Sequence, residues 1–124
     1  MAAALKNIVI EQGATYLWEQ TLLAGKGLAA PAMDLSGMSL HMQIRPEVAS
    51  ETVLLSLSSD ATGITILPQA GATLGQLRIE ITAVQTAALA FESAVYDLEL
   101  VQADGRVIRL YKGSVALDLE VTRL

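Results

Sequence analysis

Apolar and polar residues alternate along most of this 124-residue chain, and a period of two predicts β-strands rather than helices. In residues 38–45, Leu40, Met42 and Ile44 share one face, and the polar residues occupy the other. Residues 76–82 alternate in the same way. We expect about nine short strands in all, over residues 7–11, 15–23, 38–45, 52–58, 64–66, 76–82, 94–101, 106–112 and 114–123.

The last third of the chain contains two predicted turns. Asp104-Gly105 is a strong hairpin signal, because a type I′ turn needs a positive φ at both central residues. Lys112-Gly113 predicts a second turn, which separates the last two strands. In the final strand we expect four apolar side chains to face inward, namely Val115, Leu117, Leu119 and Val121.

One segment favours a helix. Thr82 is a suitable N-cap, and Ala87, Ala88 and Leu89 favour helical backbone. Because the segment is only one or two turns long, we expect a short crossover near residues 83–90. The pattern therefore predicts an all-β protein, an immunoglobulin-like antiparallel β-sandwich in one domain over residues 1–124. A small barrel is the alternative.

Two strands carry residues of uncertain exposure. Residues 15–23 place Tyr16 and Trp18 on one face and Leu17 and Glu19 on the other, so we expect burial on both faces. The N-terminal strand alternates Ile8 and Ile10 with more polar positions.

The composition suggests that part of the surface is covered by a partner. Hydrophobic residues make up 52% of the chain, charged residues only 17% and aromatic residues 4%, and the mean hydropathy is +0.46. Large exposed apolar patches usually mark interaction sites. The alternative is a compact monomer with a surface rich in Ala, Ser and Thr.

Charge and cysteine content exclude other classes. The net charge is −5, and the eight basic residues are scattered, whereas nucleic-acid binding needs a basic face. The chain has no cysteine, which excludes disulfides and thiolate metal sites. We expect neither a signal peptide at the N-terminus nor a membrane-spanning segment.

His41 is the sole histidine and the obvious candidate for a catalytic base. A Ser-His-Asp triad would need it beside a nucleophilic serine, but Ser39 and the other nearby serines lack the context of a nucleophile elbow. We therefore expect a solvated strand histidine.

Two pairs of carboxylates share strand faces, Asp97 with Glu99 and Asp118 with Glu120. Residues i and i+2 of a strand lie about 7 Å apart, which is compatible with a glycosidase pair. A sugar cleft needs more aromatic residues than this chain has. We expect instead an acidic outer face opposite Arg106 or Arg109.

We therefore predict that the protein is not an enzyme, with no catalytic residues and no metal or cofactor. A carbohydrate-stacking platform at Tyr16 and Trp18 is a further alternative. Tyr96 resembles the tyrosine corner of sandwich domains, and we expect it to be a buried packing residue.

The order of the motifs resembles a known family. The matching pieces run nearly from end to end, namely residues 8–18, Pro31, 34–37, 42–45, 63–66, 77–89, 96–100, 104–105, 109–110, Gly113 and 120–123. Together they resemble the small β-sandwich modules encoded in tail and baseplate gene clusters of tailed phages and prophages. These modules are similar to the N-terminal immunoglobulin-like domain of baseplate upper proteins.

The resemblance implies a phage virion structural protein, a tail-tip, baseplate or fibre-attachment adaptor that acts through protein–protein contacts. Its location would be the virion tail, after synthesis in the cytoplasm of the bacterial host. Its partners would be other tail or baseplate proteins, in a homo-oligomer such as a trimer or ring. A carbohydrate- or receptor-binding module on the virion is the alternative. The predicted interface residues are Tyr16, Trp18, Ile8 and Ile10, within an apolar N-terminal segment that starts at Ala2.

Overall fold

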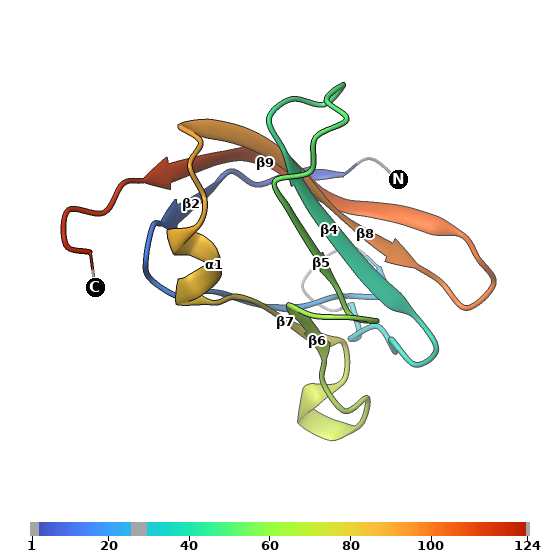
Figure 1. The fold of residues 1–124 in the computed structure, drawn as a ribbon. Coiled ribbons are helices and arrows are strands. Elements are labelled where there is room, and N and C mark those ends of the chain that lie inside the picture. The colour runs from blue at the N-terminus through green and yellow to red at the C-terminus, as the bar shows by residue number, and fades with distance from the viewer. Residues whose placement is uncertain (1–2, 26–29, 124) are drawn as a thin grey trace.

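The computed structural model describes residues 3–25 and 30–123, which form two β-sheets and little helix (Figure 1). The strands are β1 (Ala4–Leu5), β2 (Ile8–Glu11), β3 (Tyr16–Thr21), β4 (Ser39–Arg45), β5 (Leu55–Ser58), β6 (Ile64–Ile66), β7 (Gln76–Ile81), β8 (Ser93–Val101) and β9 (Val107–Asp118). A 3₁₀ turn spans Gly71–Thr73, and the helix α1 spans Ala83–Ala87.

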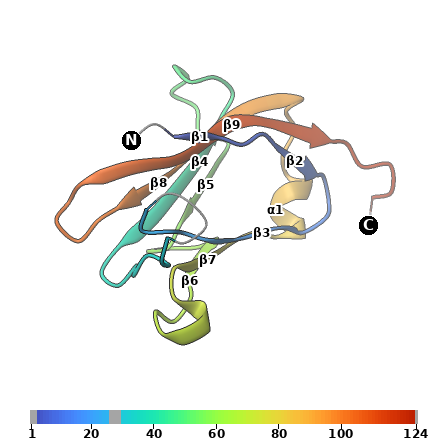
Figure 2. The same cartoon turned by 180° about the vertical axis from the view of Figure 1, so that it is seen from behind.

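The sheets pack as the two layers of a sandwich (Figures 1 and 2). The large sheet has the order β1-β9-β8-β4-β5, and β2 also pairs with β9. The small sheet has the order β3-β7-β6. The predicted immunoglobulin-like sandwich is confirmed. In that fold, strands B, E and D are neighbours in one sheet, and strands C, F and G are neighbours in the other. Here β3, β7 and β6 have the first arrangement, and β4, β8 and β9 have the second. Adjacent strands are antiparallel except β1 and β2, which run parallel to β9.

The core lies between the sheets and follows the predicted alternation. Leu40, Met42 and Ile44 of β4 are fully buried, and so are Ile79 and Ile81 of β7. Each such side chain contributes about 1.5–3 kcal/mol relative to an exposed one. The period-two pattern therefore set both the strands and their inward faces.

Strand β3 is buried on one face only, so the expectation for its other face was wrong. Trp18 is buried, whereas the side chain of Leu17 is 52% exposed. Glu19 lies on the same outer face as Leu17 and forms an ion pair with Arg78 of β7, at 3.4 Å. The reason is architectural, because the described strands form only two sheets and the residues on this outer face, such as Leu17, Glu19 and Glu80, are exposed.

The predicted crossover helix is confirmed, with Thr82 as its N-cap. The Thr82 side chain accepts a hydrogen bond from the Gln85 N–H, and the Gln85 side chain accepts one from the Thr82 N–H. This reciprocal capping box satisfies two donors that a helix start otherwise leaves free.

The hairpin at Asp104-Gly105 is confirmed, but its type I′ turn is wrong. Gly105 has a φ of 90°, and every described non-glycine residue has a negative φ. The Gly105 N–H donates to Gln102 O at 2.9 Å, and the Gln102 N–H donates to Arg106 O at 2.8 Å. The loop thus has three residues with a left-handed glycine at its end, the next most common hairpin form.

The predicted turn at Lys112-Gly113 is also wrong, because β9 continues through both residues. An added Cβ at Gly113 would collide with the carbonyl oxygen of Lys6, which passes close to β9. Gly113 therefore permits a close approach between strands rather than a turn. The total of nine strands agrees with the prediction only because β1 was missed and the last two expected strands are one.

The chain leaves the large sheet at Asp118, five residues before the predicted strand end. Leu119 and Val121, which were expected to be buried, are exposed instead. The β2 register ends at the pair Glu11–Asp118, and no strand of the described chain flanks β9 beyond that point. An alternation of apolar and polar residues does not by itself produce a β-strand where no neighbouring strand is present to pair with it.

Candidate functional site

The predicted interface residues lie mostly inside the molecule. Ile8, Ile10 and Trp18 belong to the hydrophobic core, and Tyr16 is half-buried against it. The side chains of Ile8, Ile10 and Trp18 are covered by this chain itself, and Tyr16 is partly covered. Of the N-terminal segment assigned to this interface, Ala2 lies outside the described residues.

Trp18 is instead the centre of an aromatic cluster. Its ring meets Tyr96 and Tyr111 edge-to-face, with centroid distances of 6.3 and 5.2 Å. The Lys6 Nζ lies 5.1 Å from its centroid, a cation–π distance. Edge-to-face pairs contribute about 0.5–1.5 kcal/mol beyond the area they bury.

The carbohydrate alternative required aromatic rings exposed along one face. All five aromatic residues lie within the described part of the chain, and each is buried or half-buried. Beyond the cluster, Phe91 and Tyr16 also pack against the core. The surface therefore offers no aromatic stacking platform in the described residues.

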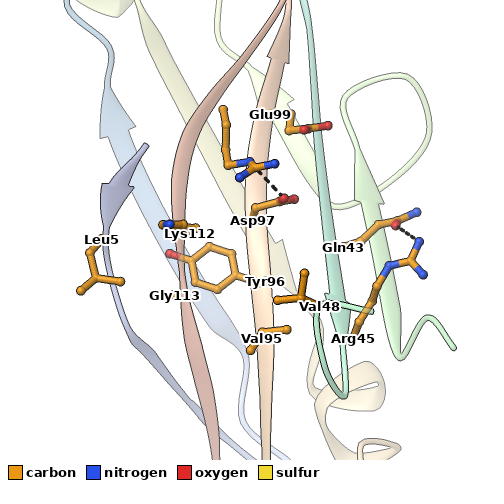
Figure 3. A pocket seen from close by; sticks show the side chains of 11 residues that line it. Leu5, Gln43, Arg45, Val48, Val95, Tyr96, Asp97, Glu99, Lys112 and Gly113 are labelled. Atoms are coloured by element: carbon orange, nitrogen blue, oxygen red, sulfur yellow. Dashed lines mark hydrogen bonds and ion pairs between the residues drawn. The ribbon is translucent and has the colours of Figure 1, made fainter. Parts of the chain in front are cut away.

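Tyr96 is the buried packing residue that the sequence predicted, and its hydroxyl has a specific partner. The Tyr96 OH donates to the carbonyl oxygen of Lys6 at 2.6 Å. Tyr96 lies directly opposite Gly113 in the β8–β9 ladder, and its ring lies beside that glycine in Figure 3. Burial, followed by the charges of Tyr16 and Tyr111, raises the pKa of the Tyr96 phenol far above its ordinary value. The neutral hydroxyl thus remains the donor that this contact needs.

His41 has polar neighbours, but they do not form a triad. Its Nε2 lies 3.1 Å from Ser39 Oγ and 3.7 Å from Asp60 Oδ2. In a Ser-His-Asp triad the serine and the carboxylate contact opposite ring nitrogens. One nitrogen accepts the serine proton, while the carboxylate holds the other nitrogen through a hydrogen bond. Here both contacts involve the same nitrogen, and the side chain is partly exposed on the large sheet.

The paired carboxylates belong to an ion-paired strand face. Arg109 Nε lies 3.4 Å from Asp97 Oδ2, which is the cross-strand pairing expected for Arg109. Arg106 pairs with Asp104 inside the turn instead. The Glu120 carboxylate packs against Gly13 beyond the end of β9, so it does not form a cleft with Asp118.

A groove lies on the outer face of the large sheet (Figure 3). Its volume is ≈ 540 Å³. The polar lining comes from β4, β8 and β9, and the apolar lining comes mainly from Leu5, Val48 and Val95. The charged residues around it are Arg45, Asp97, Glu99, Arg109 and Lys112.

The rim of this groove carries large apolar side chains that nothing covers. Leu5 is 72% exposed, and Val48, in the loop after β4, is 87% exposed. Val9 lies further along the same edge and is 60% exposed. The sequence contained a signal for Val9, since period two turns it outward once Ile8 and Ile10 face the core.

Other kinds of site have little support in the described residues. Residues 3–25 and 30–123 contain no group of three or more His, Asp or Glu residues placed to hold a metal ion. In the same part of the chain, no helix is long and apolar enough to cross a membrane.

Comparisons with known proteins do not identify a family for this chain. No family model matches the chain, and no curated protein matches it. Among solved structures, CopC from Methylosinus trichosporium OB3b is similar over 99% of this chain and 91% of its own, with 15% sequence identity and a TM-score of 0.43.

Proposed function

We propose that this protein is a structural module of a phage tail, acting as a tail-tip, baseplate or fibre-attachment adaptor through protein–protein contacts. The contact surface in this proposal is the outer face of the large sheet, around the groove of Figure 3. The tail location rests on the sequence resemblance described above.

The exposure of large apolar side chains on that face carries the proposal. Leu5, Val9 and Val48 together place unburied aliphatic surface beside charged groups. Apolar residues with a polar rim are typical of protein interfaces. The low content of charged residues, 17%, also favours a surface that is partly covered in an assembly.

Two observations support a contact module over the alternatives. Ser39 and Asp60 both contact the same ring nitrogen of His41, which is not the geometry of nucleophilic catalysis. The aromatic residues are buried or half-buried, so no observation favours carbohydrate binding. Membership of a trimer or ring remains a prediction.

Mass spectrometry of purified virions tests this proposal directly. Particles from the bacterial strain that carries the gene would be separated into tails and heads after mild disruption. We expect the chain in the tail fraction at a constant ratio to the other tail proteins. Its absence from intact particles, with the protein present in the infected cell, would overturn the proposal.

A further inference from the structure

Strand β2 forms an open edge of the large sheet. It pairs in parallel with β9, and no other strand of the described chain pairs with it. The Lys6 N–H donates to Lys112 O, and the Gln12 N–H donates to Asp118 O, both at 2.9 Å. Since strand residues direct their main-chain groups alternately to either side, Ile8 and Ile10 also face β9. The main-chain groups of Val9 therefore point away from the sheet.

The side chains along this edge are accessible as well. Asn7, Val9 and Glu11 are all exposed. Val9 lies beside Ala116 in the parallel register, and Ala116 is also exposed. An apolar residue with free main-chain groups on an edge strand is a template for pairing with another chain.

We propose that β2 pairs antiparallel with β2 of a second copy of this chain, about a two-fold axis that passes beside Val9. Val9 then lies opposite Val9 of the second copy, and the two exchange both main-chain hydrogen bonds. The outer face gains a row of four small apolar side chains, Ala116 and Val9 from each copy. The inference rests on the proposed function only in that the protein acts through protein–protein contacts.

Side-chain chemistry selects the register. A two-fold axis at Val9 places the amide of Asn7 opposite the carboxylate of Glu11 from the second copy, twice in the dimer. Glu11 lies next to Asp118 in the monomer, so two acidic side chains are neighbours there. An amide opposite Glu11 supplies a hydrogen-bond donor, whereas an axis at Glu11 would oppose two carboxylates. Like charges directly opposite each other are destabilising.

Two other open edges fit a second copy less well. The small sheet has β3 at its edge, and Glu19 lies near the middle of that strand. A two-fold axis there would oppose two glutamates. At the far edge of the large sheet, β5 offers serines, and the Ser58 N–H is already bonded to Thr62 O at 2.9 Å.

Single-cysteine variants test this contact cleanly, because the natural chain has no cysteine. In a hydrogen-bonded antiparallel pair the opposed Cα atoms are about 5.5 Å apart, which lies inside the ~4.4–6.8 Å that a disulfide spans. Val9→Cys would be oxidised in a glutathione buffer and followed on non-reducing gels. The matched controls are Val84→Cys on α1 and Leu17→Cys on the β3 edge, both exposed positions. We expect covalent dimers of Val9→Cys to form at least about tenfold faster than those of either control.

A second variant keeps the test decisive. Val9→Lys opposes two ammonium groups at the axis, while Val84→Lys adds the same charge elsewhere. Sedimentation equilibrium should show a dimer dissociation constant at least about tenfold higher for Val9→Lys than for Val84→Lys. Circular dichroism melts would show that both variants fold.

The outcomes separate this inference from the proposed function. Equal oxidation rates for Val9→Cys and its controls, a dimer that survives Val9→Lys, or a natural chain that stays monomeric or forms only trimers would each overturn the β2 contact. If the chain is found in virion tails but β2 does not crosslink, the contact alone fails. Rapid crosslinking of a chain that is absent from virions would support the contact and refute the tail assignment.

Discussion

At the scale of single residues, the Tyr96 hydroxyl links three strands of the large sheet. It extends from β8 across Gly113 of β9 and donates to Lys6 O, between β1 and β2. In a regular parallel ladder Lys6 O would accept the Ser114 N–H, but here that N–H donates to Asn7 Oδ1 at 3.0 Å. The tyrosine thus completes a ladder that is irregular at this point.

Removing this hydroxyl should loosen the N-terminal strands. Tyr96→Phe keeps the ring but leaves Lys6 O without its donor, so we expect the free energy of unfolding to fall by about 1 kcal/mol. Urea denaturation measures the change. Tyr111→Phe is the matched control, because no described residue accepts a hydrogen bond from its hydroxyl, and it should cost less. Equal losses in the two variants would contradict this role of Tyr96.

Alkaline pH should destabilise the protein through the same group. The pKa of Tyr96 is raised from 10.0 in the folded chain, first by burial and then by Tyr16 and Tyr111. Its contribution to stability is therefore complete below pH 10 and is lost as the pH rises further. Burial also raises the pKa of Tyr16 in the same direction.

The free energy of unfolding between pH 8 and 11 measures this effect. We expect the natural chain to lose stability above pH 10 more steeply than Tyr96→Phe. A residual decline in the variant is expected from Tyr16. Parallel curves for the two proteins would mean that Tyr96 does not contribute.

At the scale of elements, β9 holds the N-terminal strands in place because Gly113 lets them approach. Gly113→Ala would drive a methyl group into Lys6 O, so we expect β1 and β2 to detach from β9 and the melting temperature to fall. Gly25→Ala is a matched control, since its added methyl would lie 3.8 Å from the Ala30 Cβ, an ordinary contact. Hydrogen exchange of residues 4–11 should rise in Gly113→Ala alone.

Elements were predictable wherever their signal was local. The strands around Leu40 and Ile79 follow period-two alternation, and α1 follows its cap at Thr82. The turn predicted at Gly113 was wrong because a glycine is needed there for a contact with Lys6, which is more than a hundred residues away in sequence. Leu119 and Val121 misled because a strand also needs a neighbour. Trp18 and Ile10 of the predicted interface lie in the core for a similar reason, since only the packing of the two sheets defines which faces are inside.

At the scale of the whole molecule, three strongly exposed apolar side chains lie on or beside the large sheet. Leu5 and Val48 lie at the groove, and Val9 lies on the free edge. In the two proposals above, Leu5 and Val48 belong to a face that contacts other tail proteins, and Val9 belongs to an edge that contacts a second copy. The exposure of Val9 could be inferred from the alternation of residues in the sequence. The place of Val48 at the groove could not, because it depends on where the loop after β4 lies.

The face can be tested apart from the edge. We expect the double variant Leu5→Ser and Val48→Ser to be incorporated into virions at least about tenfold less than the natural chain when the two compete in one infection. Val84→Ser, which removes an equally exposed valine from α1, should be incorporated normally. Quantitative mass spectrometry of particles gives the ratio, and equal incorporation of all three proteins would contradict a role for the groove.

The most direct test of the central claim, that the open β2 edge of the large sheet makes a protein contact at Val9, is the molar mass of the purified protein. Light scattering over a concentration series would be measured for the natural chain and for Val9→Lys. We predict that the mass of the natural chain rises from 13.1 kDa towards twice that value, while Val9→Lys stays near the monomer mass. A natural chain that remains at the monomer mass at every concentration would contradict this contact.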